Sequence, residues 1–294
     1  MSDLKSIILR ALHKNGRMTA IQLSKLKPQN RQGEVVSYLA NQKGKKVYYL
    51  RSYINVNKML NRWEDDLWKR IDQRNNDPDL WTLPEERRRA GKPHEDLFRT
   101  TNLLHDLGVA DLYCSLYPHN YEDGQALLTE WDRDKTSPQF LELYYDARLL
   151  LYGQEMFFEH ERGNHAILEK GKKVSGDYYS KSLNKKLDNY VAYFDKHPFS
   201  KRLLLITVED WSGGYYDAKG TEEYLADVVS CCARYPIAER ILVARHRDVV
   251  GDREHTEGEI HNEVMGDPLG AVWLSSTDPQ DFVSISDALR HLSK

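Results

Sequence analysis

Residues 144–161, "YYDARLLLYGQEMFFEHE", predict a β-hairpin with acidic residues at its open end. Hydrophobic and aromatic residues fill two short segments, and Gly153, which lies between them, is typical of a turn. Asp146 stands at the start of the first segment, whereas Glu159 and Glu161 end the second. These positions are about equally far from the turn, so pairing of the two segments brings three carboxylates together.

The second strand separates its acidic residues from the histidine between them. Side chains two apart in a strand share a face, so we expect Glu159 and Glu161 to point together and His160 to point away. Carboxylates this close repel one another unless a cation lies among them. Mg²⁺ and Mn²⁺ are hard ions that take oxygen ligands of this kind. The hairpin therefore predicts a Mg²⁺ or Mn²⁺ site with Asp146 and Glu159 as ligands. Without Asp146, the stretch from Glu159 to Glu161 would indicate only a solvated strand end.

Beyond the hairpin, helical and strand patterns alternate along the chain. The run 201–210, "KRLLLITVED", is apolar almost throughout, which is typical of a strand covered on both faces. Cys231 and Cys232 fall among the apolar residues of a helical segment and are expected to pack in its core. The alternation favours an α/β (α+β) domain with a mixed sheet. The expected elements are helices at 181–197 and 221–235 and strands at 201–210, 239–247 and 270–277.

Three histidines lie close together in the sequence near its C-terminal end. His246, His255 and His261 lie in a stretch rich in charged residues, but their spacing matches no common zinc pattern, so we interpret the stretch as a polar loop. The chain has no GxxxxGK[ST], strand-linked GxGxxG or GxSxG motif, which argues against nucleotide hydrolysis and acyl transfer.

Three cysteines without paired spacing predict a reducing, cytoplasmic location, and no apolar run is long enough for a membrane span.

Charge is divided unevenly along the chain. Residues 1–58 hold twelve Lys or Arg against Asp3 and Glu34, a formal charge of +10, so the remainder carries −13 of the total of −3. Such asymmetry indicates a module that binds a polyanion, joined to a domain of different character.

The basic segment has the pattern of a winged helix-turn-helix domain. Apolar spacing predicts helices at 6–13, 19–26 and 31–42, and residues 45–53, "KKVYYLRSY", predict a strand. In that fold the third helix enters the major groove and the wing contacts phosphates. A three-helix protein-docking module with a solvated basic surface is the alternative. The residues expected to contact DNA are Arg31, Gln32, Ser37, Asn41, Lys43, Lys45, Lys46 and Arg51.

Domain boundaries follow from a polar, proline-containing interval. We expect a winged-helix DNA-binding domain at 1–75, a linker at 76–95 and a second domain at 96–294. The second domain would begin with a helix at 96–117, in which His105 lies.

The order of these patterns resembles the PD-(D/E)xK nuclease fold, also called restriction-endonuclease-like. More narrowly, residues 1 to about 275 resemble the replication-relaxation family found on plasmids and other mobile elements. That family combines a winged helix with HxL, PDA, ExD and K-L-x-x-Y motifs. The counterparts here are "LLHDLGVADLY" (His105), "TEWDRD" (Glu130), "YYDARL" (Asp146), "FFEHERGN" (Glu159 and Glu161) and "NKKLDNY" (Lys186 and Tyr190).

The resemblance implies a set of site residues. Asp146 and Glu159, with Glu130 or Glu161, would hold Mg²⁺ or Mn²⁺. Glu161 occupies the place where an active nuclease of this fold has a lysine, and Tyr145 replaces the proline of PDA. In some relatives the lysine lies on the following helix. The implied catalytic residues are therefore Asp146, Glu159, Glu161 and Lys186, and His105 and Tyr190 complete the motifs.

Three functions are compatible with these observations. The first is a DNA-binding protein of a mobile element that nicks or cleaves DNA, a metal-dependent endonuclease. The second is a transcriptional regulator or replication-accessory protein without catalysis, whose nuclease-like domain mediates homodimer formation or partner binding. The third is an adaptor whose basic module docks an acidic protein. The expected partner is double-stranded DNA in the first two and a protein in the third, with no membrane in any.

Overall fold

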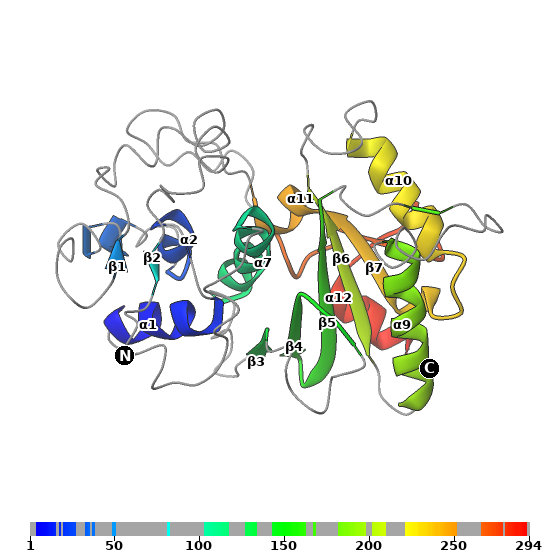
Figure 1. Cartoon of the computed structure of the whole chain (residues 1–294), viewed down its shortest axis with the longest axis horizontal. Coiled ribbons are helices and arrows are strands. Elements are labelled where there is room, and N and C mark those ends of the chain that lie inside the picture. Colours follow the sequence, from blue (N-terminus) through cyan, green and yellow to red (C-terminus); the bar gives the residue numbers. More distant parts are fainter. Residues whose placement is uncertain are drawn as a thin grey trace. The chain divides into compact units, whose positions relative to one another are not determined.

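The computed structural model describes sixteen stretches of the chain, which fall into two compact units (Figure 1). One unit comprises residues 1–126 with 251–265, and the other comprises 127–250 with 266–294. Each unit is described by itself. The described residues are 4–15, 18, 20–27, 33–35, 37–38, 49–50, 81–82, 103–117, 127–133, 143–162, 167–168, 182–197, 202–209, 221–251, 266–278 and 280–292.

The part of the first unit that the structure describes contains helices and one small strand pair. Its elements are α1 (Leu4–Asn15), α2 (Ala20–Ser24), β1 (Tyr49–Leu50), β2 (Trp81–Thr82) and α7 (Leu103–Leu116). The buried amide of Gln22 on α2 donates hydrogen bonds to the Leu107 carbonyl oxygen at 2.7 Å and to Asp111 Oδ1 at 2.9 Å, both on α7. The helix expected to open the second domain therefore packs in the first unit.

Several predictions for the first unit fall on residues that the structure does not describe. The expected helices at 6–13 and 19–26 are present as α1 and α2. β1 lies within the expected strand and pairs antiparallel with β2, which belongs to the stretch expected to link the domains. Of the residues expected to contact DNA, Ser37 is described and is exposed, and the other seven lie outside the described residues.

The second unit contains a seven-stranded mixed sheet whose spatial order follows the sequence, β3 to β9. The two pairings β5–β6 and β6–β7 are parallel, and the others are antiparallel. The predicted mixed α/β character is therefore confirmed. The strands are β3 (Leu128–Asp132), β4 (Ala147–Leu151), β5 (Gln154–Glu161), β6 (Leu203–Val208), β7 (Ile241–Arg245), β8 (Trp273–Ser275) and β9 (Phe282–Val283).

The predicted hairpin is present as β4 and β5. Tyr152 and Gly153 form a two-residue turn with φ of 52° and 68°, the left-handed pair that matches the twist of a hairpin. β4 begins only at Ala147, so Asp146 precedes the strand, and its N–H donates to the Phe158 carbonyl oxygen at 3.1 Å. The turn therefore sets Asp146 beside the end of β5, as expected.

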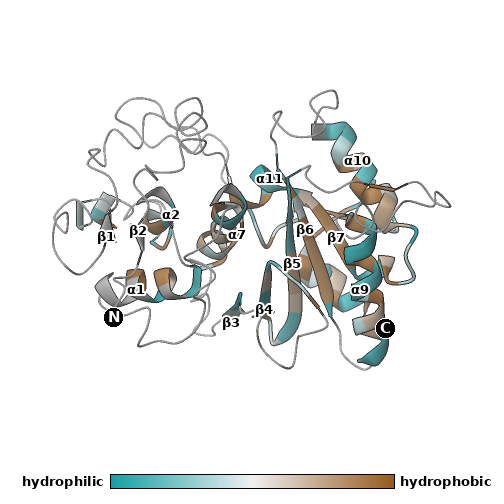
Figure 2. Ribbon diagram, in the orientation of Figure 1, coloured by the Kyte–Doolittle hydropathy of each residue, from teal (hydrophilic) through white to brown (hydrophobic). Residues whose placement is uncertain are grey.

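Helices cover the sheet and close its core. The helices are α9 (Leu183–Lys196), α10 (Thr221–Cys232), α11 (His246–Val250) and α12 (Ile285–His291), with a 3₁₀ turn, η5, at Ala238–Arg240. Figure 1 shows α9 and α10 on one side of the sheet. Phe157, Ile206 and Val243 belong to one buried cluster with residues of both helices. Figure 2 shows that β6 and β7 are hydrophobic along most of their length. Strands that are covered on both faces have this composition. Cys231 and Cys232 are buried in this core, as predicted.

One prediction for this unit is wrong. His246 does not lie in a polar loop: it begins α11 directly after β7 and is only 1% exposed. His255 and His261 lie outside the described residues. Among the helices that the structure describes, none is long and apolar enough to cross a membrane.

Candidate functional site

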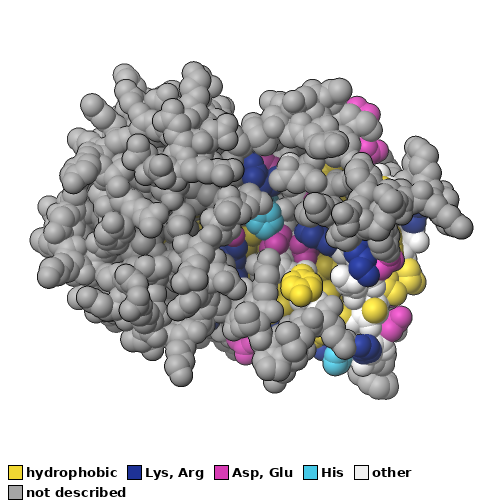
Figure 3. All heavy atoms as spheres, in the orientation of Figure 1, with side chains coloured by type: hydrophobic (Ala, Val, Ile, Leu, Met, Phe, Trp, Pro, Cys, Tyr) yellow, Lys and Arg dark blue, Asp and Glu magenta, His cyan; other side chains and the backbone are white. Residues whose placement is uncertain are grey.

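The last residues of β5 present different chemistry on the two faces of the sheet. Glu159 and Glu161 contact residues of α9. His160 contacts Thr207 on β6, Glu209 directly after β6 and the His246 ring directly after β7. This is the alternation that the sequence predicts for a strand. Charged side chains of both signs are visible on the surface in Figure 3, but the two glutamates are at most 1% exposed. Their burial makes partners obligatory.

Lys186 is the partner of both buried glutamates. Its Nζ lies 2.7 Å from Glu159 Oε2 and 3.0 Å from Glu161 Oε1. Tyr190, one helical turn further along α9 and therefore on the same face, donates from its hydroxyl to Glu159 Oε1 at 2.6 Å. The lysine from the helix, as implied by the nuclease resemblance, thus reaches the carboxylates from the strand.

Asp146, directly before the neighbouring strand β4, completes this group. Its carboxylate is 4% exposed, and Oδ2 accepts a hydrogen bond from the backbone N–H of His160 at 2.8 Å. The structure therefore brings together five of the residues expected at the site. We call Asp146, Glu159, Glu161, Lys186 and Tyr190 the carboxylate cluster.

Burial and charge shift the pKa values in the carboxylate cluster. Burial, with a further contribution from the Asp146 charge, raises the pKa of Glu159 to about 7, although Lys186 and Tyr190 act in the opposite direction. Burial would lower the pKa of Lys186, but the three surrounding carboxylates raise it well above its usual value. Burial and the Glu159 charge likewise raise the pKa of Tyr190. Lys186 is therefore a permanent cation, and Glu159 changes its protonation near neutral pH.

Among the expected site residues of this unit, Glu130 is not part of this cluster. Glu130 on β3 is 53% exposed at its side chain and pairs with Arg148 at 2.9 Å. It lies opposite Leu150, four residues along β4 from Asp146, or roughly 13 Å at about 3.3 Å per residue. His105 lies on α7, in the other unit. The structure thus does not join Glu130 to the predicted metal ligands.

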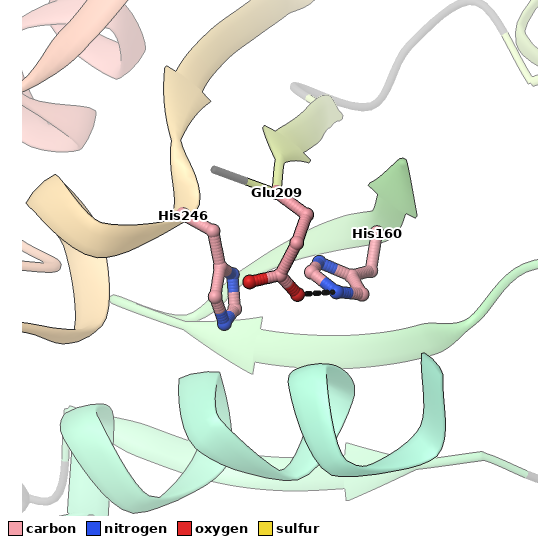
Figure 4. A group of neighbouring side chains, drawn as sticks. All are labelled: His160, Glu209 and His246. Atoms are coloured by element: carbon pink, nitrogen blue, oxygen red, sulfur yellow. Dashed lines mark hydrogen bonds and ion pairs between the residues drawn. The ribbon is translucent and has the colours of Figure 1, made fainter. Parts of the chain in front are cut away.

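A second group of polar residues lies on the opposite face of the same strands. His160 Nε2 is 3.0 Å from Glu209 Oε2, and both His160 Nδ1 and His246 Nδ1 are 3.1 Å from the Thr207 hydroxyl oxygen. The two imidazole rings are 4.3 Å apart between centroids. Figure 4 shows the Glu209 carboxylate between the two rings. We call His160, Glu209 and His246, with Thr207 behind them, the histidine cluster.

The sequence contained an incomplete indication of the histidine cluster. Alternation along β5 shows that His160 points away from Glu159 and Glu161. What it meets there depends on the parallel register of β5, β6 and β7, which aligns Thr207 with His160 and with Ala244. The sequence pattern that could have predicted the cluster is the presence of polar residues at the carboxyl ends of successive buried strands. Such ends meet at one edge of a sheet.

Comparison with known proteins identifies no relative. No protein-family model matches the chain, and no curated protein or solved structure matches it significantly. The resemblance to the replication-relaxation family stays a prediction that rests on its motif residues.

Proposed function

We propose that the protein binds DNA and hydrolyses phosphodiester bonds with the help of a divalent cation at the carboxylate cluster. The observation that carries the proposal is the convergence of Asp146, Glu159 and Glu161 from one hairpin with Lys186 from the next helix. Acidic residues at the end of a hairpin, with a lysine beside them, are the catalytic residues of the nuclease fold that the sequence resembles. The basic segment 1–58 supplies attraction for the DNA backbone.

The donor set fits Mg²⁺ or Mn²⁺. All three acidic side chains offer oxygen atoms, the ligands that these ions prefer. When all three carboxylates are ionised, they and the Lys186 ammonium carry a formal charge of −2, which one divalent cation neutralises. A bond to Lys186 or Tyr190 uses one lone pair of a carboxylate oxygen and leaves another for an ion. Asp146, Glu159 and Glu161 would hold the ion. When bound, the ion would polarise the phosphate and lower the pKa of a bound water molecule.

The residues of the chain contribute charge and orientation. Lys186 keeps its positive charge at all physiological pH values because three carboxylates surround it, so it can stabilise negative charge that develops on a phosphate. Tyr190 fixes the Glu159 carboxylate by its hydrogen bond. The Asp146 carboxylate is held by the His160 N–H, which keeps it at the end of β5. These contacts preorganise the acidic groups before a cation binds.

A nicking assay tests the proposal. Supercoiled plasmid incubated with the full-length protein and Mg²⁺ or Mn²⁺ should be nicked or linearised, and a chelator should abolish this. Asp146→Asn and Lys186→Met should each lower the rate by at least about 100-fold, the cost of about 2.7 kcal/mol of transition-state stabilisation. Asp188→Asn, an exposed carboxylate on α9, is the matched control and should cleave like the wild type. Absence of wild-type cleavage, or equal cleavage by all variants, would sink the proposal.

A non-catalytic regulator is the second candidate. The observation that favours it is the Lys186 ion pair with two glutamates, because it neutralises part of the cluster without any metal. In this function the cluster stabilises the fold, and the protein only binds DNA. Binding of a duplex with no metal-dependent cleavage would support it against hydrolysis.

A further inference from the structure

We propose that His160, Glu209 and His246 form a binding site for a divalent transition-metal ion, with Zn²⁺ as the preferred occupant, separate from the carboxylate cluster. The three potential ligand atoms all lie within 4.8 Å of one another. Both histidines are at most 1% exposed, and the Glu209 side chain is 16% exposed. The site is therefore built into the fold and is not a chance meeting of surface side chains.

Three different elements fix the ligands. His160 is on β5, Glu209 follows β6, and His246 begins α11 immediately after β7 (Figure 4). The Glu209 N–H donates to the Glu161 carbonyl oxygen at 2.8 Å, which continues the parallel pairing and holds the carboxylate at this level. The carboxyl ends of parallel strands form the edge where α/β sheets bind their ligands.

Distances within the histidine cluster are close to those around a bound ion. Two ligands of a tetrahedral Zn²⁺, each about 2.0–2.1 Å from the metal, are about 3.3 Å apart. His160 Nε2 and Glu209 Oε2 are 3.0 Å apart. All three potential ligand atoms lie within 4.8 Å of one another. Coordination of one ion therefore requires the ligand atoms to approach by at most about 1.5 Å in any pair.

Thr207 orients both imidazole rings. Its hydroxyl oxygen lies 3.1 Å from Nδ1 of each histidine. A hydroxyl oxygen can accept two hydrogen bonds, so it can receive an N–H from both rings, which leaves both Nε2 lone pairs for a metal. Histidine ligands of metals are usually held in this way through their other ring nitrogen.

The ligand types select the kind of metal. Two imidazole nitrogens and one carboxylate suit Zn²⁺ and related transition metals, whereas Mg²⁺ prefers oxygen ligands alone. Three protein ligands are also the number found in catalytic zinc sites, where water or substrate takes the fourth position. The two clusters should therefore differ in metal preference, although both lie along β5.

Metal titration of the full-length protein tests this proposal. After treatment with a chelator, the wild type should bind about one Zn²⁺ per chain in calorimetry, and Co²⁺ in its place should give the visible absorption of a site with nitrogen ligands. Glu209→Gln and His246→Asn should each weaken the affinity by at least about 100-fold, and Thr207→Val by about 10- to 100-fold. His197→Asn, which removes an exposed histidine, should leave the affinity unchanged.

Two further variants separate the possible results. Glu161→Gln alters the carboxylate cluster alone, so Zn²⁺ affinity should persist in it. Glu209 is partly exposed, so its glutamine variant should fold, which circular dichroism will check. Equal Zn²⁺ affinity in the wild type, Glu209→Gln and His246→Asn would overturn the proposal, as would loss of Zn²⁺ binding in Glu161→Gln with retention in Glu209→Gln.

Discussion

At the scale of single residues, the carboxylate cluster depends on one ammonium group. Lys186 lies within 3.0 Å of two glutamates that are almost completely buried. A buried ion pair contributes little net stability when compared with apolar residues, but removal of one partner leaves the other charge without compensation. Lys186 is therefore more important for stability than a lysine on a helix surface.

Replacement of Lys186 by methionine should lower the free energy of unfolding by about 3 kcal/mol, because two buried carboxylates lose their cation. Urea denaturation followed by circular dichroism measures this. Lys185→Met, at the preceding position of the same helix, is the control and should change the stability by about 0.5 kcal/mol or less. A loss in Lys186→Met no larger than that in the control would contradict the role assigned to the ion pair.

The raised pKa of Glu159 predicts how the stability of the protein depends on pH. The pKa of this carboxyl is raised from 4.5 to about 7, so the folded protein holds a proton there that the unfolded chain has released. The wild type therefore loses stability as the pH rises from about 4.5 to about 7, on the order of 3 kcal/mol in total. Glu159→Gln lacks this loss because glutamine resembles the protonated acid. Melting curves at pH 5 and 7.5 should show that the stability of the variant relative to the wild type is greater at pH 7.5 than at pH 5. The same difference in stability at both pH values would contradict the raised pKa.

Residue-level prediction from the sequence succeeded where contacts are local. The pairing of Asp146 with the end of β5 follows from the turn at Gly153, only seven residues away. The contacts of Thr207 with His160 and His246 span 47 and 39 residues and depend on strand register. Nothing in the local pattern around His246 distinguishes a buried helix start from a charged loop, so that prediction failed.

At the scale of elements, α9 positions two members of the carboxylate cluster, so its start matters. Ser182 caps the helix: its hydroxyl oxygen accepts the Lys185 N–H at 3.2 Å. Ser182→Ala should lower the free energy of unfolding by about 1 kcal/mol, because one N–H at the helix start loses its partner. Ser182→Thr should retain most of the stability. Equal loss in both variants would indicate a packing effect at this buried position.

The hairpin and the next strand are joined by a second ionic group. Glu155 on β5 binds Arg148 on β4 at 2.6 Å and also binds Arg202, just before β6. Burial raises the pKa of Glu155, but the two arginines outweigh it and the pKa is lowered overall. A lowered acid pKa stabilises the fold above the unfolded value of about 4.5, and this stability is lost as the pH falls through the folded pKa.

Acid titration therefore distinguishes Glu155 from Glu159. The difference in stability between the wild type and Glu155→Gln should be largest near pH 7 and should shrink as the pH falls below about 4.5. Chemical denaturation between pH 3 and 7 measures it. A difference that stays constant over this range would mean that the arginines do not act on the Glu155 charge.

The elements themselves were largely predictable. The strands β5, β6 and β7 and the helices α9 and α10 lie within the predicted segments, because their apolar spacing is regular. The first hairpin strand begins three residues later than the aromatic run suggests: Tyr144 and Tyr145 are strand-like in composition, yet only Tyr145 is buried. Composition thus indicates the strand but not its first residue.

At the scale of the whole molecule, the division of charge makes a prediction for DNA binding. With +10 on residues 1–58, affinity for a duplex should fall by about 10³-fold between 50 and 200 mM salt if about six phosphates are neutralised. Asp146→Asn should show the same salt dependence, because it lies outside the basic segment. Fluorescence anisotropy with a labelled duplex measures both. Affinity that is absent or insensitive to salt would favour the adaptor function.

The sequence does not show which compact unit α7 joins. The apolar spacing of 96–117 identifies a helix but not its neighbours, and α7 packs on α2 through the Gln22 amide. A helical pattern in the sequence thus identifies a helix but not the compact unit to which that helix belongs.

The length of the β4–β5 hairpin has a consequence for how this protein can evolve. Both clusters take residues from consecutive positions of β5, so their placement depends on the two-residue turn at Tyr152 and Gly153. A single inserted or deleted residue in the hairpin that shifts the register by one would exchange the faces of Glu159, His160 and Glu161. Both clusters would then be lost in one mutational step. Descendants that keep either cluster should therefore keep the hairpin length, whatever substitutions they accept within it.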